Sequence, residues 1–424
     1  MSEIIVDNKK YEFVVIGMGY VGLTYSLHLN TFGYKVVGIE TNVNTIKMIN
    51  NRILPFYEEG IEGRLNNFVK QGLLKAESPE NYKINNNNTS KIYIVTVGTP
   101  VQNKKINKDS LNKVFDFLNS VLKDDDAIIL RSTVGIGLTR EFCDLISKNI
   151  YYCFAPERTI EGKATVELAT LPQVCGTNDL HSKTFFKTLF NLISSEVYEV
   201  STTESAELVK LTSNVYRDVT FGFSNEISLI SNKNGINSKE VIDACNFKYP
   251  RCNIYSPGPV AGPCLSKDAY ILSDVINESS NSIILSARSL NENYILDILS
   301  DLLKDVQNVS ILGLSFKGTP PTNDIRDSYA LTLSKFLKSK KIFVSAYDPL
   351  VFNEDFENHG IERNNTLEDA FKNKDLIIIQ NNNQIFKRMD INKLSQLSNK
   401  NSVILDLWSL HENLELKNSK YIGI

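Results

Sequence analysis

The first half of the chain alternates short, mostly apolar runs with segments of helical periodicity. The apolar runs lie at residues 13–16, 35–39, 91–97, 127–130 and 151–155. Helical patterns lie between them at about 23–32, 109–122 and 139–147. Runs of this length are typical of buried strands, and strands that alternate with helices form a largely parallel sheet. This half is therefore predicted to be a Rossmann-like α/β domain, with the asparagine run at 85–88 as a surface loop.

The same alternation returns near the C-terminus, after a long helical segment. That segment extends from about residue 203 to 234, with Thr203 as the predicted N-cap and Gly235 as the residue that ends it. Strand patterns follow at 310–314, 342–347, 375–379 and 403–406. The predicted fold class is α/β with three domains: a Rossmann-like domain at 1–202, a central helical segment at 203–300 and a second Rossmann-like domain at 301–424.

Composition narrows the classes of partner. The chain has 424 residues and a formal net charge of -3, which gives no electrostatic reason to expect a nucleic acid or an anionic membrane as partner. No apolar run approaches the roughly 20 residues that span a bilayer, and the N-terminus lacks the features of a secretory signal. The six cysteines contain no CxxC pair, and the four histidines are not spaced as metal ligands. We therefore expect a cytoplasmic protein with reduced thiols and no metal.

The first strand runs directly into a glycine-rich turn, and the second strand ends in an acid, Glu40. The residues of the turn that we expect to contact a cofactor are Gly17, Gly19, Tyr20, Val21 and Gly22. Such glycines allow a pyrophosphate to approach a helix N-terminus, and a carboxylate at the end of the second strand can accept hydrogen bonds from a ribose diol. Because that carboxylate would repel a 2′-phosphate, the unit predicts an NAD site. A glycine-rich turn without a ligand is the alternative, and the complete strand–turn–helix–strand–acid order disfavours it.

Polar residues follow three later strands of the same predicted sheet. These residues are Thr99 within the segment 98–100, Thr133 directly after Ser132, and Glu157. Loops at the carboxyl ends of parallel strands are where ligands bind in such sheets. We therefore expect these side chains to face one crevice.

A glycine- and proline-rich segment at 256–268 contains Cys264 and leads into an apolar run. If a helix begins directly after Cys264, its thiol lies at the positive end of a helix dipole with Lys267 nearby, and both favour the nucleophilic thiolate. A turn with an incidental buried cysteine is the alternative.

On the long central helix, Lys210, Asn214 and Arg217 share one stripe, which is either a functional face or a solvated one.

Taken together, these motifs resemble the UDP-glucose/GDP-mannose dehydrogenase family of nucleotide-sugar 6-dehydrogenases over nearly the full chain. The matching segments are 17–22 with Glu40, 132–133, 156–158 with 161–164, 207–210 with Asn214, Arg251, 262–264 with 267–268, and 313–318 with 324–326. The resemblance implies an NAD-binding domain, a helical dimerisation segment and a C-terminal domain that binds the UDP part of a UDP-sugar. It also implies a homodimer in which Arg251 reaches the substrate of the neighbouring subunit.

The resemblance implies a four-electron oxidation of a sugar C6 alcohol to a carboxylate, with two NAD per turnover. Cys264 would attack the intermediate aldehyde to give a thiohemiacetal and then a thioester, which water hydrolyses. Lys210 would stabilise the oxyanion or transfer protons, with Asn214 as its hydrogen-bond partner. Asp268 and Glu157 are further candidate bases, and Thr133 would hold a water that relays the proton. The division of base duty among Lys210, Asp268 and Glu157 stays open.

The resemblance also assigns binding residues. The expected cofactor contacts beyond the glycine turn and Glu40 are Thr99, Thr133 and Arg326. The expected substrate contacts are Glu157, Arg158, Lys210, Asn214, Arg217, Arg251 and Lys317.

The segments 214–218, 156–158 and 249–254 resemble the branch that acts on UDP-N-acetylhexosamines, so UDP-N-acetylmannosamine and UDP-N-acetylglucosamine are the leading candidate substrates. The alternatives are a UDP-glucose 6-dehydrogenase, a single-step hydroxy-acid type of dehydrogenase, and an inactive protein that only binds nucleotide sugars. The loop before Cys264 departs at Ala261 and Pro263 from the Gly-Val-Gly-Gly-His-Cys that is common in this branch, which reshapes the part expected to face the sugar. The segment 96–100 departs from the common Val-Pro-Thr-Pro.

Overall fold

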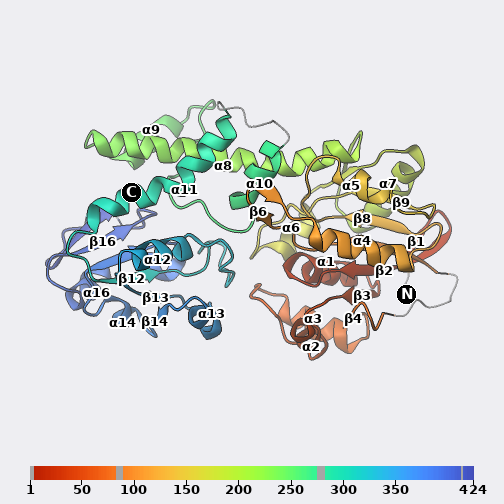
Figure 1. Cartoon of the computed structure of the whole chain (residues 1–424), viewed down its shortest axis with the longest axis horizontal. Coiled ribbons are helices and arrows are strands. Elements are labelled where there is room, and N and C mark those ends of the chain that lie inside the picture. The colour runs from red at the N-terminus through yellow and green to blue at the C-terminus, as the bar shows by residue number, and fades with distance from the viewer. Residues whose placement is uncertain (1–3, 83–88, 275–281, 412–413) are drawn as a thin grey trace. The chain divides into compact units, whose positions relative to one another are not determined.

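The computed structural model describes residues 4–82, 89–274, 282–411 and 414–424 (Figure 1). The predicted loop at 85–88 lies outside the described residues. The chain forms two compact units. Unit 1 holds the residues up to Ser213 and the short segment from Tyr270, and unit 2 holds Asn214–Ala269 and the remainder of the chain to Ile424. The three-domain division at 202 and 300 stays a prediction.

Unit 1 is built on a nine-stranded sheet of the Rossmann type. Its strand order is β11-β10-β9-β8-β5-β2-β3-β4, with β1 paired to β2. The strands are β1 (Ile4–Val6), β2 (Lys9–Ile16), β3 (Val36–Ile39), β4 (Leu74–Glu77), β5 (Ser90–Val95), β8 (Ala127–Leu130), β9 (Tyr151–Phe154), β10 (Gln173–Gly176) and β11 (Val197–Val200). Neighbouring strands from β4 through β2 to β9 run parallel, whereas β1 and β10 run antiparallel to β2 and β9. The prediction of a Rossmann-like domain is confirmed.

Both faces of this sheet are covered, which explains its continuous apolar strands. Along β2, Phe13 and Val15 belong to one buried cluster, whereas Val14 and Ile16 belong to another. Successive side chains of a strand point to opposite faces, so a strand with apolar residues at every position buries both faces. The helices of unit 1 are α1 (Tyr20–Thr31), α2 (Val43–Asn50), α3 (Glu62–Lys70), α4 (Asp109–Val121), α5 (Leu138–Cys143), α6 (Ala164–Thr170) and α7 (Leu180–Ile193), and a small hairpin joins β6 (Val101–Gln102) to β7 (Lys105–Ile106).

One predicted helix is shorter than expected. The pattern at 139–147 predicts a helix to residue 147, but α5 ends at Cys143. A turn follows, in which the Ile146 amide donates to the Cys143 carbonyl at 3.0 Å. Leu145, an apolar residue of the predicted last turn, is 69% exposed, so it buries no surface that would extend the helix.

Unit 2 contains a second, fully parallel sheet. Its strand order is β14-β13-β12-β15-β16-β17. The strands are β12 (Asn308–Leu312), β13 (Phe343–Tyr347), β14 (Glu362–Arg363), β15 (Leu376–Ile379), β16 (Ser402–Asp406) and β17 (Ser419–Gly423). The accompanying helices are α12 (Tyr329–Ser339), α13 (Asn353–Asn358), α14 (Leu367–Phe371), α15 (Gln384–Arg388), α16 (Ile391–Leu394) and the 3-10 helix η2 (Ser395–Leu397). The second α/β sheet is confirmed, with β14 and β17 as additions that the apolar pattern did not predict.

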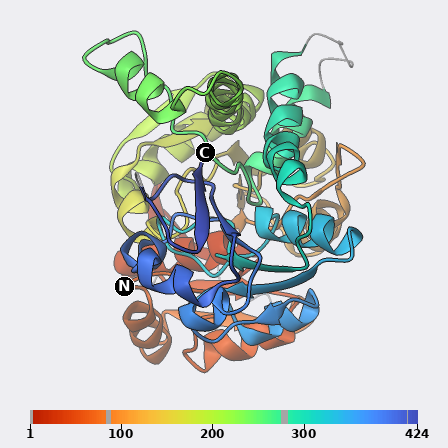
Figure 2. The same ribbon diagram turned by 90° about the vertical axis from the view of Figure 1, so that its left-hand side faces the viewer.

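The central part of the chain is helical, with α8 (Thr203–Lys233), α9 (Ser238–Asn246), α10 (Leu265–Ser273) and α11 (Ile283–Leu302). Figures 1 and 2 show α8 as one unbroken helix, seen side-on and nearly end-on. Its N-cap is one residue earlier than predicted, because the Thr202 hydroxyl accepts from the Ser205 amide at 3.1 Å. Gly235 ends the helix as predicted, with a φ of 68° and the Ile236 amide bonded to the Ser231 carbonyl at 2.9 Å.

None of the helices in the described part of the chain has the length and apolarity that a bilayer span requires. Within the same residues, no cluster of three or more histidine, cysteine or acidic side chains could hold a metal ion.

Candidate active site

The glycine-rich turn between β2 and α1 has the geometry of a dinucleotide cradle. Gly17 has a φ of 90°, and a Cβ atom at Gly22 would lie 1.8 Å from the Gly17 carbonyl oxygen, so neither position accepts a side chain. Gly19 caps the N-terminus of α1, and an added Cβ there would meet nothing within 4 Å. The backbone at the helix N-terminus is therefore open to a phosphate, as the NAD prediction requires.

The carboxylate of Glu40 lies beside this turn. One of its oxygens accepts from the Met18 amide at 2.8 Å, and the other accepts from the amides of Thr41 at 2.7 Å and Asn42 at 2.9 Å. These contacts fix a negative charge at the end of β3, next to the glycine turn. The position fits a ribose diol and disfavours a 2′-phosphate.

The loops after β5 and β8 are joined by hydrogen bonds. The Thr99 hydroxyl donates to the Thr133 carbonyl at 2.5 Å, and the Ser132 hydroxyl donates to the Val97 carbonyl at 2.7 Å. The structure therefore brings Thr99 and Thr133 together, as their positions at the ends of parallel strands predict.

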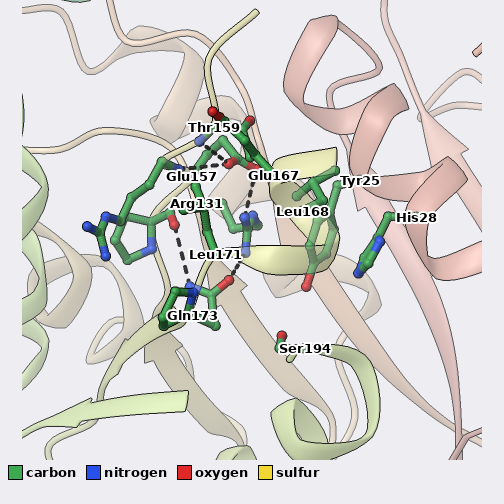
Figure 3. Close-up of a pocket in the computed structure, with 13 residues that line it drawn as sticks. Tyr25, His28, Arg131, Glu157, Thr159, Glu167, Leu168, Leu171, Gln173 and Ser194 are labelled. Atoms are coloured by element: carbon green, nitrogen blue, oxygen red, sulfur yellow. Dashed lines mark hydrogen bonds and ion pairs between the residues drawn. The ribbon is translucent and has the colours of Figure 1, made fainter. Parts of the chain in front are cut away.

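Glu157 lies buried at the end of β9, and its carboxylate is fully engaged (Figure 3). It forms an ion pair with Arg131 at 2.7 Å and accepts from the amides of Arg158 at 2.7 Å and Thr159 at 2.8 Å. Burial alone would raise the pKa of this carboxyl, but the Arg131 charge and the hydrogen bonds from Thr159 outweigh it and lower the pKa. A carboxylate held in this way is a weak base.

Lys210 is held by the same loop through the main chain. The Lys210 side chain is buried, and its Nζ atom donates to the Glu157 carbonyl oxygen at 2.6 Å. One turn earlier, the buried carboxylate of Glu207 accepts from the amides of Gly137 at 2.6 Å and Thr139 at 2.8 Å. These contacts anchor the start of α8 to the N-terminus of α5, so the position of Lys210 is fixed from two sides.

A pocket lies beside the Arg131–Glu157 pair, and Figure 3 shows the side chains around it. The residues that line it are Tyr25, His28, Arg131, Pro156, Glu157, Arg158, Thr159, Glu167, Leu168, Leu171, Pro172, Gln173 and Ser194.

In unit 2, Cys264 is exposed and lies directly before α10. Its carbonyl accepts from the amides of Asp268 at 3.0 Å and Lys267 at 3.3 Å, so Cys264 occupies the N-terminal cap position. The buried carboxylate of Asp268 contacts Lys267 Nζ at 2.8 Å and accepts from the Asn214 amide group at 2.6 Å. The predicted helix start is confirmed, and the alternative of a buried cysteine is wrong.

The shape of the cysteine loop depends on Gly262. Its φ is 96°, its amide donates to the Asp327 carbonyl at 2.9 Å, and an added Cβ would lie 2.5 Å from the Phe316 ring. The buried side chain of Arg288 holds both ends of the loop, donating to the Val260 carbonyl at 3.3 Å and the Leu265 carbonyl at 3.0 Å. The departures at Ala261 and Pro263 therefore flank a glycine that the fold requires.

The remaining predicted binding residues lie at or near the surface of the two units. Arg158, Arg217, Arg251 and Arg326 are exposed and Lys317 is half-buried. Arg326 is paired with Asp324 at 2.5 Å. The Arg251 guanidinium stacks on the Tyr249 ring at 4.5 Å, and Lys317 Nζ lies 5.3 Å from the Phe316 ring centroid.

The sequence did not point to three buried charged residues: Glu58, Arg131 and Arg288. Glu58 accepts from the Tyr20 hydroxyl at 2.6 Å and from the Gly162 amide at 2.6 Å, so it links the glycine turn to the loop after β9. Each of these residues has partners far away in sequence. No local pattern identifies Glu58 or Arg288. For Arg131 the one local signal is weak: it is a charged residue directly after an apolar run.

Sequence models of a single family match three consecutive parts of the chain. The NAD binding domain of the UDP-glucose/GDP-mannose dehydrogenase family matches residues 11–194, the central domain matches 204–293 and the UDP binding domain matches 310–413. The chain belongs to the UDP-glucose/GDP-mannose dehydrogenase family. The resemblance predicted from the motifs is thus confirmed, and this family member is an NAD-dependent nucleotide-sugar dehydrogenase that oxidises UDP-sugars.

Relatives that align over more than nine-tenths of the chain support the assignment. The chain is 31% identical to the UDP-N-acetyl-D-mannosamine dehydrogenase of Methanococcus aeolicus, over 94% of this chain and 92% of that protein. It is 26% identical to the NDP-N-acetyl-D-galactosaminuronic acid dehydrogenase of Ralstonia nicotianae, over 93% of this chain and 96% of that protein. Among solved structures, it is similar to the UDP-D-ManNAc dehydrogenase of Pyrococcus horikoshii, with a TM-score of 0.86, 26% identity and coverage of 97% and 99% of the two chains.

Proposed function

We propose that this family member oxidises the C6 hydroxymethyl group of UDP-N-acetylmannosamine to the carboxylate. The observation that carries the chemistry is the exposed Cys264 at the N-terminus of α10, directly before the turn that holds the buried Asp268. The names of the relatives support the choice of sugar, since several of them are UDP-N-acetyl-D-mannosamine dehydrogenases.

The glycine turn and Glu40 fit NAD; each bound NAD would accept one hydride, so two NAD per turnover would take up the two hydrides that leave the sugar carbon. Gly17, Gly19 and Gly22 would leave the N-terminus of α1 open to its pyrophosphate, and Glu40, which lies beside the turn, would accept hydrogen bonds from its ribose. We assign Thr99 and Thr133 to the same side of the site because their loops are joined.

Cys264 serves as the nucleophile. Its thiolate adds to the carbonyl carbon of the C6 aldehyde, forming a C–S bond while the carbonyl electron pair becomes an oxyanion that takes up a proton. Loss of hydride from this thiohemiacetal, with the hydroxyl proton, leaves a thioester. Water then attacks the thioester carbon, the C–S bond breaks, and the carboxylate leaves with the thiolate restored. The partial positive charge at the N-terminus of α10 stabilises the thiolate in each cycle.

We assign the oxyanion to Lys210 and Asn214, which lie one turn apart on α8. Asp268 accepts from the Asn214 amide group at 2.6 Å and pairs with Lys267 Nζ at 2.8 Å, and we assign it the proton transfer because it contacts a residue assigned to the oxyanion. Glu157 is a weaker base because its carboxylate is committed to Arg131 and to two backbone amides. Its contribution is the carbonyl oxygen that holds Lys210 Nζ.

We further propose a homodimer formed through α8. Tyr216, Phe223 and Ile230 are spaced by seven residues, so they share one face of the helix, and they are 59%, 50% and 53% exposed. Large apolar side chains exposed in such a stripe mark an interaction surface, and a second copy of this chain presents the same stripe. Light scattering tests this directly: the wild type should be a dimer and Phe223→Glu should be largely monomeric, whereas an unchanged mass would contradict the proposal.

Complementation between subunits tests whether Arg251 acts on the neighbouring active site. Arg251→Ala and Cys264→Ser homodimers should each be inactive. A mixed dimer should regain activity, because one of its sites then has an intact thiol and receives Arg251 from the other subunit. Absence of any recovery in mixed dimers would assign Arg251 to its own subunit.

The substrate assignment is tested with purified protein, NAD and a panel of UDP-N-acetylmannosamine, UDP-N-acetylglucosamine, UDP-glucose and GDP-mannose. The proposal predicts the highest kcat/KM with UDP-N-acetylmannosamine. A preference for another sugar would overturn the substrate while leaving the chemistry intact, and NADH formation with none of them would overturn the function.

A further inference from the structure

Arg131 is a buried cation that the proposed chemistry does not use. It follows β8 directly and precedes Ser132 and Thr133, and its side chain is 1% exposed. One guanidinium nitrogen contacts the Glu157 carboxylate at 2.7 Å and another donates to the Gln173 side-chain oxygen at 2.8 Å. Its flat face lies 4.0 Å from the centre of the Tyr25 ring (Figure 3). The guanidinium is therefore fixed on three sides.

The Glu157 carboxylate transmits this fixed position to its loop. Besides the Arg131 contact, it accepts from the amides of the next two residues, Arg158 and Thr159. Three hydrogen bonds to one buried carboxylate set the course of the main chain at Glu157. That same residue presents the carbonyl oxygen that accepts from Lys210 Nζ at 2.6 Å. A continuous chain of contacts thus leads from Gln173 and Tyr25 through Arg131 and Glu157 to Lys210.

We propose that Arg131 is a positioning residue for the oxidation: it holds the Glu157 loop so that the Glu157 carbonyl fixes the Lys210 ammonium at the reacting oxygen. The inference rests on the proposed function, in which Lys210 stabilises the oxyanion. Arg131 itself contacts no reacting atom in this scheme.

The physical basis is the cost of a buried carboxylate without a counter-ion. Removal of one partner from a buried ion pair leaves an uncompensated charge, which the protein avoids by taking up a proton or by moving the group toward water. Protonation weakens the hydrogen bonds from the amides of Arg158 and Thr159, and movement toward water breaks them, so either response lets the loop shift. A displacement of about 1 Å in a catalytic group can cost on the order of 100-fold in rate.

Apart from Lys210, whose ammonium is held by the Glu157 main-chain carbonyl, the titratable groups buried around Glu157 supply no further positive charge. Burial raises the pKa of Tyr25 to about 12 and lowers the pKa of His28, so both side chains are neutral at pH 7. Burial also raises the pKa of Cys153, whose thiol is likewise neutral. The charged or titratable side chains around Glu157 from the neighbouring elements are Tyr25 and His28 of α1, Arg131 after β8, Cys153 of β9, Arg158, Glu167 of α6, Cys175 of β10 and Lys210 of α8.

The test compares Arg131→Met, Arg131→Lys and the double variant Arg131→Met with Glu157→Gln, using the full-length enzyme, NAD and its best UDP-sugar. Arg131→Met should lose on the order of 100-fold in kcat while its KM for NAD stays unchanged, because the glycine turn is not involved. Its kcat should also rise with pH through an additional ionisation, since the ionised Glu157 accepts from the two amides more strongly than the neutral acid does. The double variant should lack that ionisation. Arg131→Lys keeps the charge but not the fork of donors, so it should recover part of the lost activity.

Lys91→Met is the matched control. Lys91 forms another ion pair of low exposure in unit 1, with Glu12, at the opposite ends of the strands from the candidate site. The Lys91→Met variant should have a lower melting temperature, but the pH dependence of its kcat should show no additional ionisation.

Three results would overturn the inference: wild-type kcat in a folded Arg131→Met, an activity loss without any new ionisation, or an Arg131→Lys no better than Arg131→Met. If Arg131→Met does not fold, Glu157→Gln takes its place, and wild-type kcat there would overturn the inference equally. Failure of the proposed function gives a different result, because the wild type would then form no NADH from any UDP-sugar.

Discussion

Replacement of Gly262 by alanine probes the loop that presents Cys264. At a φ of 96° an L-residue is strained by about 1 to 2 kcal/mol. The new Cβ would lie 2.5, 2.8 and 3.0 Å from three atoms of the Phe316 ring, and overpacking of this kind costs about 1 to 3 kcal/mol. Together these effects predict a loss of about 2 to 5 kcal/mol in the stability of the loop.

Relief of that strain requires a shift of Gly262 or Phe316, and neither is free to move. The Gly262 amide is bonded to the Asp327 carbonyl at 2.9 Å, and the Phe316 amide to the Asp324 carbonyl at 3.0 Å. Because Cys264 follows two residues later, we expect kcat to fall on the order of 100-fold for a displacement of about 1 Å. Thermal melting and NADH formation measure the two effects.

Gly235→Ala is the matched control for Gly262→Ala. Its φ of 68° carries the same kind of backbone strain, but an added Cβ meets nothing within 4 Å. The control should therefore lose only about 1 to 2 kcal/mol and keep wild-type kcat. The reasoning is refuted if Gly262→Ala is as stable as Gly235→Ala and equally active, since the contact with Phe316 would then not constrain the loop.

Three further predictions follow from buried or fixed carboxylates. Glu207→Gln leaves at least one of the donors on half-buried Gly137 and buried Thr139 without an acceptor, so the free energy of unfolding should fall by about 1 to 3 kcal/mol in a denaturant titration. The folded-state pKa of Glu157 is lowered, so its ion pair stabilises the fold at pH values above the ordinary carboxyl pKa. This stabilisation is lost as the pH falls through the folded-state pKa. Unfolding measured against pH should show the wild type converging on Glu157→Gln in acid, and a constant difference would contradict this. Glu40→Ser should reduce the preference for NAD over NADP by about tenfold in kcat/KM, equivalent to roughly 1.4 kcal/mol of charge repulsion.

The sequence predicts those parts of the fold and site that depend on local pattern. Continuous apolar strands imply a sheet covered on both faces, and the two buried clusters around β2 confirm it. The helix after Cys264 is also local, because the glycine- and proline-rich segment ends where an apolar run begins. By contrast β10 and β11 are four-residue strands with polar residues at one or more positions, so their pairing depends on neighbours and not on pattern.

The charged residues that shape the site are not predictable in this way. Arg131 contacts Glu157 and Gln173, which are 26 and 42 residues away in sequence. Arg288 reaches Asp218 across 70 residues. Such pairs satisfy buried charges that only the assembled fold brings together. Glu157 shows the consequence: the family resemblance implies a base, but its carboxylate is committed to the interior.

The central claim is that Cys264 carries the substrate through a covalent intermediate. The most direct measurement is the amount of NADH formed per UDP-sugar consumed, in the wild type, in Cys264→Ser and in Cys245→Ser, which alters another exposed cysteine of unit 2. The account predicts two NADH and a uronate product for the wild type and Cys245→Ser, and no uronate for Cys264→Ser. One NADH per sugar in the wild type, with full activity in Cys264→Ser, would contradict it.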